Sequence, residues 1–200
     1  MKDKEGLDLK IAKAIILDGS AKDDREAGIA GKTLHAELER KGVKFTHWTL
    51  RDLEIAPCIG CFKCWTKTPG ECVFDDEQRK IYSDMAKSDL VILITPITFG
   101  GYSSELKKGL DRFIPILLPF FKKYNGETHH ASRYGKEWNL LAVGTLPSKD
   151  EEKQILFRDL VQRNSLNMHS ESSSSMILFK GSNENEIQVQ MTAGIDQVIK

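Results

Sequence analysis

The sequence predicts an α/β fold in which a parallel sheet is covered by helices on both faces. Short apolar runs alternate with helical segments of roughly ten to fifteen residues, and right-handed crossovers between parallel strands place helices over each face. The run Leu90-Val-Ile-Leu-Ile94 has no polar position, which is typical of a strand buried on both faces. With 200 residues, of which 40% are hydrophobic and 29% charged, the chain fits one globular domain.

Five strands are expected, and turn residues bound most of them. They cover residues 11–17, 44–50, 90–94, 138–143 and 176–179. The first strand ends at Asp18-Gly19-Ser20, and Gly42 stops the helix that precedes the second. The serine-rich segment 170–175 is expected to be an exposed loop that leads into the fifth strand.

Five helices are expected between and after these strands. They cover residues 28–41, 75–87, 103–113, 151–167 and about 184–200. Asp75-Asp76 occupies the N-cap position of the second helix and Ser103 or Ser104 that of the third, because Asp and Ser side chains accept hydrogen bonds from the first free N–H groups of a helix. The last helix would complete a single domain that spans residues 1–200.

Charge and hydropathy exclude two classes of partner. The 29 Lys and Arg residues balance the 29 Asp and Glu residues without any basic tract, so neither nucleic acid nor an anionic membrane surface is an expected partner. No apolar run approaches the length of a membrane span, and residues 1–6 lack the apolar core of a signal peptide. We therefore expect a cytoplasmic protein, in which structural disulfides are disfavoured.

The cysteines of the chain all lie in one loop, residues 56–73, as Cys58, Cys61, Cys64 and Cys72. This confinement indicates thiolate chemistry or ligation. The Cys-x2-Cys-x2-Cys run is typical of iron–sulfur sites, and Cys72 could supply the fourth thiolate of a [4Fe-4S] cluster. Free or reversibly oxidised thiols at the mouth of an active site are an equally open interpretation. Zinc is a weaker one, because the usual second pair of ligands does not accompany the run.

Ligands of such sheets bind beside the carboxyl ends of the strands, and three loops there have suggestive sequences. Residues 19–28 could wrap a phosphate with backbone N–H groups and the Ser20 hydroxyl, although an ordinary polar turn would also fit them. Residues 96–103 alternate apolar and aromatic side chains with glycines, which suits either a flat ring system or a plain packed turn. Gly144 and Thr145 lie at the same edge, after the fourth strand.

Three segments, in this order along the chain, resemble one known family. They are Ala56-Pro-Cys-Ile-Gly-Cys-Phe-Lys-Cys-Trp65, then Pro69-Gly-Glu-Cys72, then Pro96-Ile-Thr-Phe-Gly-Gly-Tyr-Ser-Ser-Glu-Leu-Lys107 with Asp111-Arg112. From about residue 11 to 167, the chain resembles the NAD(P)H-dependent FMN reductase and iron–sulfur flavoprotein branch of the flavodoxin-like superfamily. The resemblance implies a flavodoxin-like three-layer sandwich with a five-stranded parallel sheet of order 2-1-3-4-5.

The resemblance also implies where cofactors bind. It places the FMN phosphate at Ser20, Lys22, Ala27 and Gly28, the isoalloxazine ring at Pro96, Ile97, Thr98, Phe99 and Gly100, and Gly144 and Thr145 on the other side of the ring. The phosphate loop departs from the family, because Ser20-Ala21-Lys22 and Glu26-Ala27 stand where Ser-Pro-Arg and a later Asn-Thr are common. NAD(P)H would pass hydride to the flavin without a catalytic acid or base from the protein, and a small-molecule or protein acceptor would receive the electrons.

The alternative function is an iron–sulfur flavoprotein electron carrier with a [4Fe-4S] cluster on the four cysteines. A third class would bind or sense a small ligand through its thiols. The resemblance favours a homodimer or homotetramer, with the apolar stretch 113–121 and Trp65 as candidate contacts. His129-His130 is expected on the surface or at an interface. A solvated helix face is expected for Lys107, Lys108, Asp111 and Arg112, with Asp111-Arg112 alternatively bracing that helix against the sheet.

Overall fold

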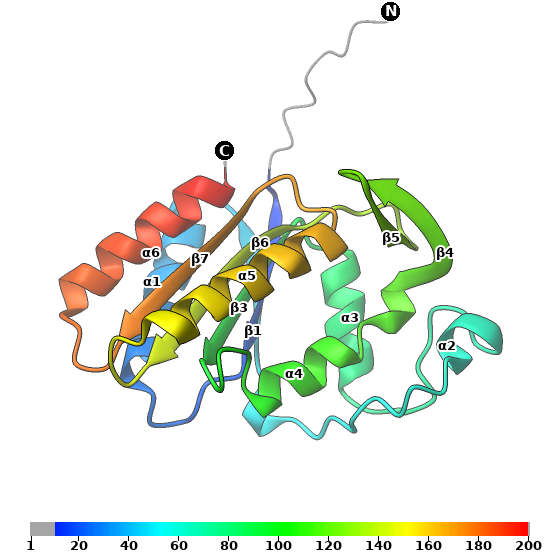
Figure 1. Cartoon of the computed structure of the whole chain (residues 1–200), viewed down its shortest axis with the longest axis horizontal. Helices are drawn as coiled ribbons and strands as arrows, with labels where there is room; N and C mark the ends of the chain where they lie inside the picture. Colours follow the sequence, from blue (N-terminus) through cyan, green and yellow to red (C-terminus); the bar gives the residue numbers. More distant parts are fainter. Residues whose placement is uncertain (1–10, 200) are drawn as a thin grey trace, which may run out of the picture.

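The structure of the protein is a computed structural model that describes residues 11–199. Its centre is a five-stranded parallel sheet of order β2-β1-β3-β6-β7 (Figure 1). The strands are β1 (Lys13–Asp18), β2 (Lys44–Thr49), β3 (Leu90–Pro96), β6 (Asn139–Leu146) and β7 (Ser173–Phe179). Because β6 and β7 are the fourth and fifth strands of this sheet along the chain, the predicted order 2-1-3-4-5 is confirmed. The prediction drawn from residues 1–6 concerns a segment outside the described residues, as does the predicted helix end at residue 200.

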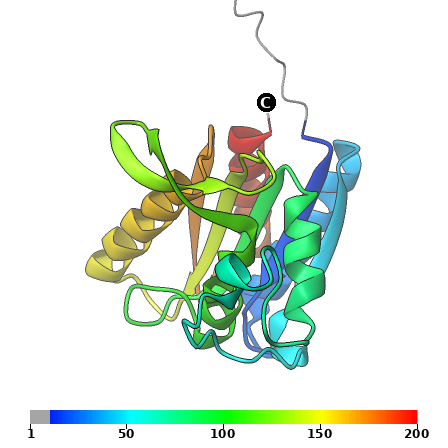
Figure 2. The same cartoon turned by 90° about the vertical axis from the view of Figure 1, so that its right-hand side faces the viewer.

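Helices cover both faces of the sheet, as Figures 1 and 2 show. One face carries α1 (Arg25–Arg40) and α6 (Glu184–Val198), and the other carries α3 (Gln78–Ala86), α4 (Ser104–Asp111) and α5 (Glu151–Asn167). Successive strand residues point to opposite faces, so Ile15 and Leu17 belong to the core under α3–α5, whereas Ile16 belongs to the core under α1 and α6. These two cores confirm the three-layer sandwich. Within residues 11–199, no helix combines the length and the apolarity that a bilayer crossing requires.

Capping side chains set where the helices begin. Asp24 accepts a hydrogen bond from the Ala27 N–H at 3.0 Å, so α1 begins three residues earlier than predicted. Ser103 caps α4, as predicted, and Asp150 caps α5 through the same kind of bond. Each such cap contributes about 1 kcal/mol to helix stability.

A two-stranded antiparallel hairpin, which the sequence analysis did not predict, is formed by β4 (Leu117–Tyr124) and β5 (Glu127–Ser132). Asn125 and Gly126 make its turn with φ angles of 48° and 82°, the left-handed pair that Asn-Gly hairpins require. The apolar stretch 113–121 therefore divides. Ile116 is buried in the core, whereas Phe120 and Phe121 on β4 are 69% and 70% exposed.

Two local predictions are wrong. β7 begins at Ser173, so residues 173–175 pair with β6 and are not an exposed loop; Ser174 is 8% exposed. His129 is not at the surface, because β5 directs it toward α5, where its Nδ1 lies 2.9 Å from Asn167 Oδ1. Its exposed fraction is 7%.

Candidate functional site

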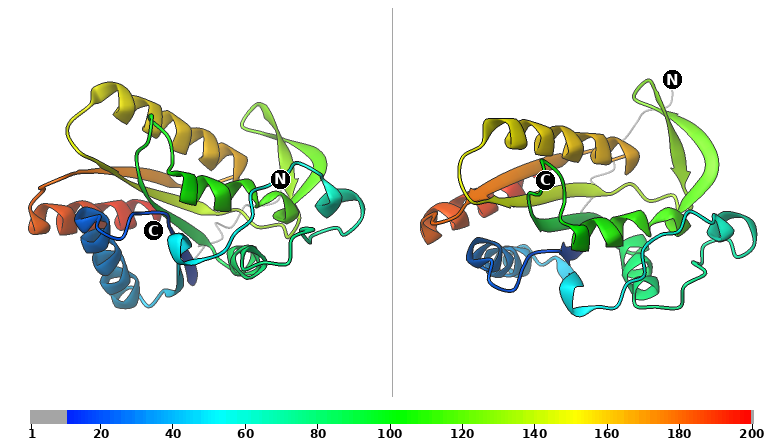
Figure 3. Two further views of the ribbon diagram at one scale, coloured as in Figure 1. Left: turned by 90° about the horizontal axis from the view of Figure 1, so that it is seen from below. Right: turned by 60° about the horizontal axis from the view of Figure 1, so that its bottom comes forward.

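The loops that follow β1, β3 and β6 meet at the carboxyl edge of the sheet, which Figure 3 shows from below. The Ser103 hydroxyl donates to the Gly19 carbonyl at 2.8 Å, and the Gly19 N–H donates to the Ile94 carbonyl at 2.8 Å. The Thr145 hydroxyl donates to the Asp24 carboxylate at 2.6 Å. Since these bonds connect all three loops, the predicted segments form one continuous surface.

The loop after β3 presents an aromatic ring at this edge. Thr98 and Gly101 exchange two backbone hydrogen bonds of 3.0 and 2.9 Å, and between them Phe99 and Gly100 have φ angles of 51° and 79°. A left-handed conformation is uncommon for a residue other than glycine, and here it leaves Phe99 94% exposed. A Cβ on Gly100 would lie 2.8 Å from Leu156, so α5 fixes the turn from behind. The loop therefore offers a rigid turn and an aromatic ring to a flat ligand.

Ile97 and Gly144 lie beneath the edge and not on it. Ile97 is 7% exposed, and its N–H donates to the Thr145 carbonyl at 2.9 Å. A Cβ on Gly144 would lie 2.6 Å from the Cδ1 of Ile97 and 3.0 Å from Phe157. The Ile97 side chain thus occupies the space that glycine leaves at position 144. Of the predicted ring contacts, Thr98 and Phe99 are the exposed ones.

The loop after β1 contains the predicted phosphate residues, but its charges are mixed. Ser20 is 5% exposed, Arg51 Nη1 lies 3.4 Å from its hydroxyl, and the Lys22 side chain is exposed. The Asp24 carboxylate carries the opposite charge to the Arg51 and Lys22 side chains, and it already accepts the N–H of Ala27 at the start of α1. The N-terminus of a helix attracts anions, and in this chain one of its own carboxylates occupies that position.

Further carboxylates surround the same loop. Buried Glu26 accepts hydrogen bonds from the Gly181 N–H at 3.0 Å and from Arg25 at 2.9 Å. Burial alone would raise the pKa of Asp18, but the His47 imidazole, 3.4 Å away, and hydrogen bonding from Ser20 hold it below its usual value of 3.8. Gly28, the last predicted phosphate residue, faces open space on the outside of α1. Arg25 already donates to Glu26 and to the Ser182 carbonyl, which leaves Lys22 and Arg51 as the cationic groups for a phosphate.

The four cysteines line one small cavity near α2 (Lys63–Thr66), on the side of the molecule opposite α6 (Figure 1). The volume of this cavity is about 20 Å³, and Arg112 is its one charged wall. Its apolar walls are Ile59, Phe62, Val73, Phe74, Ile114 and Pro115. All four thiols are free, and burial, together with the nearby Cys72, raises the pKa of Cys64. The structure thus brings the four sequence-predicted cysteines to one point.

Arg112, Asp76 and Ala56 close the base of the cysteine loop. The two Nη atoms of Arg112 donate to the Asp76 carboxylate at 2.8 and 3.0 Å, and Nη1 also donates to the Ala56 carbonyl at 2.6 Å. The Ala56 N–H donates to Asp76 at 3.0 Å. Because Ala56 precedes the first cysteine and Asp76 follows the last, these bonds fix both ends of the loop.

This clamp corrects one prediction and bears on another. Arg112 is 1% exposed, so it does not belong to a solvated helix face. Besides its bonds to Arg112, the Asp76 carboxylate accepts the N–H of Gln78, the first residue of α3, at 3.2 Å, so Asp76 supports the start of this helix as predicted. Burial alone would raise the pKa of Asp76, but the hydrogen bonds from Arg112 and Ala56 bring it below its usual value of 3.8.

The charge of Arg112 faces the thiols. Its guanidinium lies 5.1 Å from the centre of the Phe74 ring, and among the described residues its buried Nε–H has no hydrogen-bond partner. Because Asp76 already balances the charge of Arg112, what remains for an occupant of the cavity is this unused N–H donor, which suits a hydrogen-bond acceptor. Within residues 11–199, no three His, Cys, Asp or Glu side chains are grouped so as to hold a single metal ion.

Comparison with known protein families assigns the chain, with its edge loops and cysteines, to one family. Residues 12–136 match the family described as NADPH-dependent FMN reductase. The chain belongs to the NADPH-dependent FMN reductase family. The matched span contains the loops after β1 and β3 and the whole cysteine loop of this family member, so the resemblance drawn from the sequence is confirmed.

Curated relatives agree with this membership, and a solved structure shares the fold. An iron-sulfur flavoprotein of Methanocaldococcus jannaschii is 32% identical over 108 residues, which cover 54% of this chain and 55% of that protein. An iron-sulfur flavoprotein of Methanosarcina thermophila is 33% identical over 127 residues, covering 64% and 60%. The chain thus spans little more than half the length of these relatives. The NAD(P)H:quinone oxidoreductase from Methanothermobacter marburgensis shares the fold, with a TM-score of 0.68 at 10% identity and coverage of 92% and 96%.

Sequence reasoning missed several residues of the site. A signal for Asp24 was present, since an Asp shortly before the apolar residues Ala27, Ala30 and Leu34, which recur at helical spacing, is a typical N-cap. Arg51 and Arg112 carried no such local signal. Their partners Ser20 and Asp76 lie 31 and 36 residues away in the sequence, so only the folded chain brings them together.

Proposed function

We propose that this member of the FMN reductase family is an FMN-dependent NAD(P)H oxidoreductase that passes electrons from a nicotinamide through bound FMN to an acceptor. The observation that carries the proposal is the joining of three loops at one carboxyl edge, with Phe99 held outward on a rigid turn. In open α/β sheets this edge is where ligands bind. Family membership supplies the cofactor class.

The ring side of the edge fits FMN. When bound, FMN would accept a hydride and release electrons singly or in pairs. The Phe99 ring can stack on a flat ligand, and the backbone of residues 98–101 can approach it closely because two positions of the turn are glycines. These residues hold and orient the ring, so we assign none of them the role of a catalytic acid or base.

The phosphate side fits less well. Ser20 and Lys22 would meet the phosphate, and Arg51 would neutralise part of its charge. Asp24, however, puts a carboxylate at the N-terminus of α1, and like charges in one site repel. The phosphate should therefore contribute less to FMN affinity than the ring does.

Flavin titration of two phenylalanine variants tests the role of the edge. Phe99→Ala should weaken FMN binding about two- to tenfold, because an aromatic stacking contact is worth about 0.5–1.5 kcal/mol. Phe120→Ala is the matched control, since Phe120 is also exposed but lies on the β4–β5 hairpin. NADH and NADPH oxidation by the FMN-loaded proteins should follow flavin occupancy. Equal FMN affinities for the two variants would contradict the assignment of the edge.

A second candidate function is supported by the cysteine cavity. We propose that Cys58, Cys61, Cys64 and Cys72 can hold a [4Fe-4S] cluster, in which case the protein would act as an electron carrier. The donor set fits, because four thiols face one cavity with apolar walls and one guanidinium. A volume of about 20 Å³ is room for roughly one water molecule, so the loop must open outward to admit a cluster.

Iron analysis after anaerobic reconstitution tests this second function. Cys64→Ser should lose most of the iron bound by the wild type, whereas Lys67→Ser, an exposed position in the same loop, should retain it. Wild-type protein that binds no iron, with its four thiols still available to alkylation, would leave the reductase function standing and reject the cluster.

Assembly and location remain proposals of the same kind. We propose a cytoplasmic homodimer or homotetramer, with the nicotinamide and an electron acceptor as its partners. Trp65 donates to the carbonyl oxygens of Ile114 and Leu117, which ties the cysteine loop to the start of β4. Exposed Phe120 and Phe121 make this end of the molecule the candidate subunit contact. Sedimentation of the wild type and of a variant with both phenylalanines replaced by serine tests it.

A further inference from the structure

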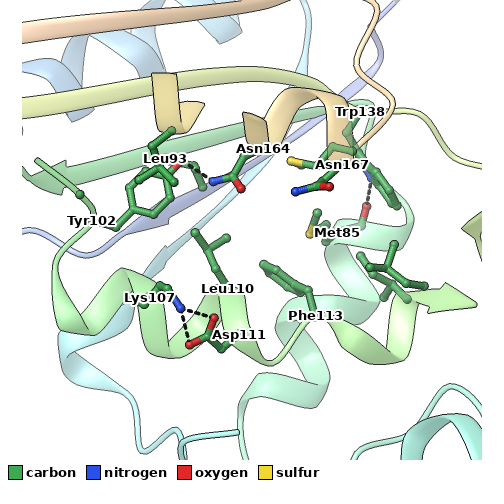
Figure 4. A pocket seen from close by; sticks show the side chains of 15 residues that line it. Met85, Leu93, Tyr102, Lys107, Leu110, Asp111, Phe113, Trp138, Asn164 and Asn167 are labelled. Atoms are coloured by element: carbon green, nitrogen blue, oxygen red, sulfur yellow. Dashed lines mark hydrogen bonds and ion pairs between the residues drawn. The ribbon is translucent and has the colours of Figure 1, made fainter. Parts of the chain in front are cut away.

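A second and larger cavity, of about 460 Å³, lies on the sheet face between α4 and α5 (Figure 4). It extends from Gly101, at the end of the β3 loop, past Leu93 within β3 to Trp138, which directly precedes β6. The cavity therefore runs under the helices toward the amino ends of the strands, away from the edge proposed to hold the flavin. Its apolar walls include Met85, Leu110, Phe113, Ile116, Leu160 and Met168.

The cavity exists because the two helices pack over different strands. α4 lies against β3, whereas α5 lies against β6 and β7, so the helical layer is open between them. Both ends of the cavity are held rigidly. Trp138 is 1% exposed and its indole N–H donates to the Met85 carbonyl at 2.9 Å, and Tyr102 packs edge-on against Phe157 with ring centroids 6.0 Å apart.

One polar group inside the cavity has an unused hydrogen. Asn164 Nδ2 donates to the Tyr102 hydroxyl oxygen at 2.8 Å, which leaves the O–H hydrogen of Tyr102 free to donate. Tyr102 is 9% exposed, and burial raises its pKa to about 12, so the phenol keeps this hydrogen at neutral pH. Figure 4 shows the pair at one end of the apolar walls.

The mouth of the cavity carries no unbalanced charge. Lys107 and Asp111, both exposed, pair with each other at 2.7 Å across one turn of α4. The exposed Asn167 lies across from them on α5, and its Oδ1 is 2.9 Å from His129 Nδ1. An ionic ligand would find no free partner among these lining side chains, whereas a neutral one would have nothing charged to desolvate.

We propose that this cavity binds a neutral, ring-containing small molecule of two or three fused rings that carries an acceptor oxygen for the Tyr102 hydroxyl. The size follows from comparison with an apolar cavity of about 150 Å³, which holds one benzene ring; the present volume is roughly three times larger. The cavity shares only Gly101 with the turn assigned to the flavin and shares no residue with the cysteine cavity, so this proposal does not depend on the proposed function.

Methionine methyl NMR tests the site directly in the protein as isolated. Met85 and Met168 line the cavity, whereas Met176 and Met191 belong to the core on the opposite face of the sheet and serve as internal controls. The probe is 1-tetralone, a two-ring ketone, and tetralin is the same ring system without the acceptor oxygen. Saturable shifts of Met85 and Met168 alone are expected, with tetralone binding about two- to tenfold more tightly than tetralin.

Three variants separate the parts of the proposal. Leu160→Trp should fill the cavity and abolish binding of both probes, while Val189→Trp, at a 70% exposed position on α6, should leave it unchanged. Tyr102→Phe should weaken tetralone about two- to tenfold and leave tetralin unaffected. If Leu160→Trp fails to fold, Leu110→Trp fills the same space from α4.

Several results would overturn the proposal. They are the absence of saturable shifts, shifts that include Met176 or Met191, binding that survives both tryptophan variants, and equal affinity for the two probes. A cavity sealed by a second copy of the chain would also give no binding, and the two tryptophan variants would then change the sedimentation of the protein.

Discussion

Replacing Arg112 by methionine should destabilise the protein more than any comparable change to a surface arginine. Arg112 and Asp76 have side-chain exposures of 1% and 16% and are joined by two hydrogen bonds of 2.8 and 3.0 Å. Removing one partner of such a buried pair costs about 3–5 kcal/mol, because the other charge is left without compensation. For a chain of this length, 1 kcal/mol corresponds to about 2–4 °C in Tm, so we expect Tm to fall by roughly 6–20 °C.

The assay is guanidinium and thermal unfolding followed by far-ultraviolet circular dichroism. Arg163→Met is the matched control, since Arg163 also binds a carboxylate through two bonds, to Glu127, but with exposures of 58% and 41%. Exposed pairs of this kind contribute little to stability because water and salt screen them. The double variant Arg112→Met with Asp76→Asn should lose less stability than the sum of the two single changes, because the two side chains act as one unit.

The pH dependence of this difference has a definite sign. The pKa of Asp76 is lower in the folded protein than its usual 3.8, so the stability it contributes is complete above 3.8 and is lost as the pH falls through the lowered value. The difference in unfolding free energy between wild type and Arg112→Met should therefore become smaller in acid. Equal costs for Arg112→Met and Arg163→Met at neutral pH would refute the reasoning.

Three further predictions concern the edge and the core. Asp24→Asn keeps the N-cap but removes its charge, so FMN affinity should rise about fivefold or more, while riboflavin affinity, measured by fluorescence quenching, stays constant. Burial and a neighbouring histidine lower the pKa of His35 below 6.5 in the folded protein. The free energy of unfolding of the wild type should therefore fall as the pH drops below 6.5, and it should fall less steeply in His35→Gln. Gly144→Ala should cost about 1–3 kcal/mol in denaturant unfolding because its Cβ would meet Ile97 at 2.6 Å, whereas Gly28→Ala, with open space around it on α1, should stabilise by roughly 0.5–1 kcal/mol. These predictions would be contradicted, respectively, by unchanged FMN affinity in Asp24→Asn, by equal pH dependence of stability in wild type and His35→Gln, and by equal unfolding free energies for the two glycine variants.

The sheet was predictable because its strands are encoded locally. A run such as 90–94 is apolar at every position, and burial on both faces is its simplest explanation. The hairpin was not predicted, although Asn125-Gly126 between two strand-forming segments is a strong turn signal. The heavily apolar stretch before it favoured a packed segment and hid that signal.

The candidate site was only partly predictable. The cysteines and the β3 loop are consecutive motifs, and the sequence shows them directly. The Arg112 clamp depends on contacts 36 and 56 residues apart in the chain, and the α4–α5 cavity depends on how far apart two helices pack. Neither can be inferred from local patterns. The filling of position 144 by Ile97 likewise appears only when β6 and the β3 loop are seen together.

The central claim is that FMN at the carboxyl edge receives electrons from a nicotinamide. The most direct test is the ultraviolet–visible spectrum of anaerobically purified protein during NADH and NADPH addition, with flavin and iron analysis of the same sample. We predict flavin bands that bleach with a nicotinamide and return with an acceptor, and about four irons per chain if the cysteines also carry a cluster. Protein without flavin bands even after FMN titration, or with bands that neither nicotinamide reduces, would contradict the claim.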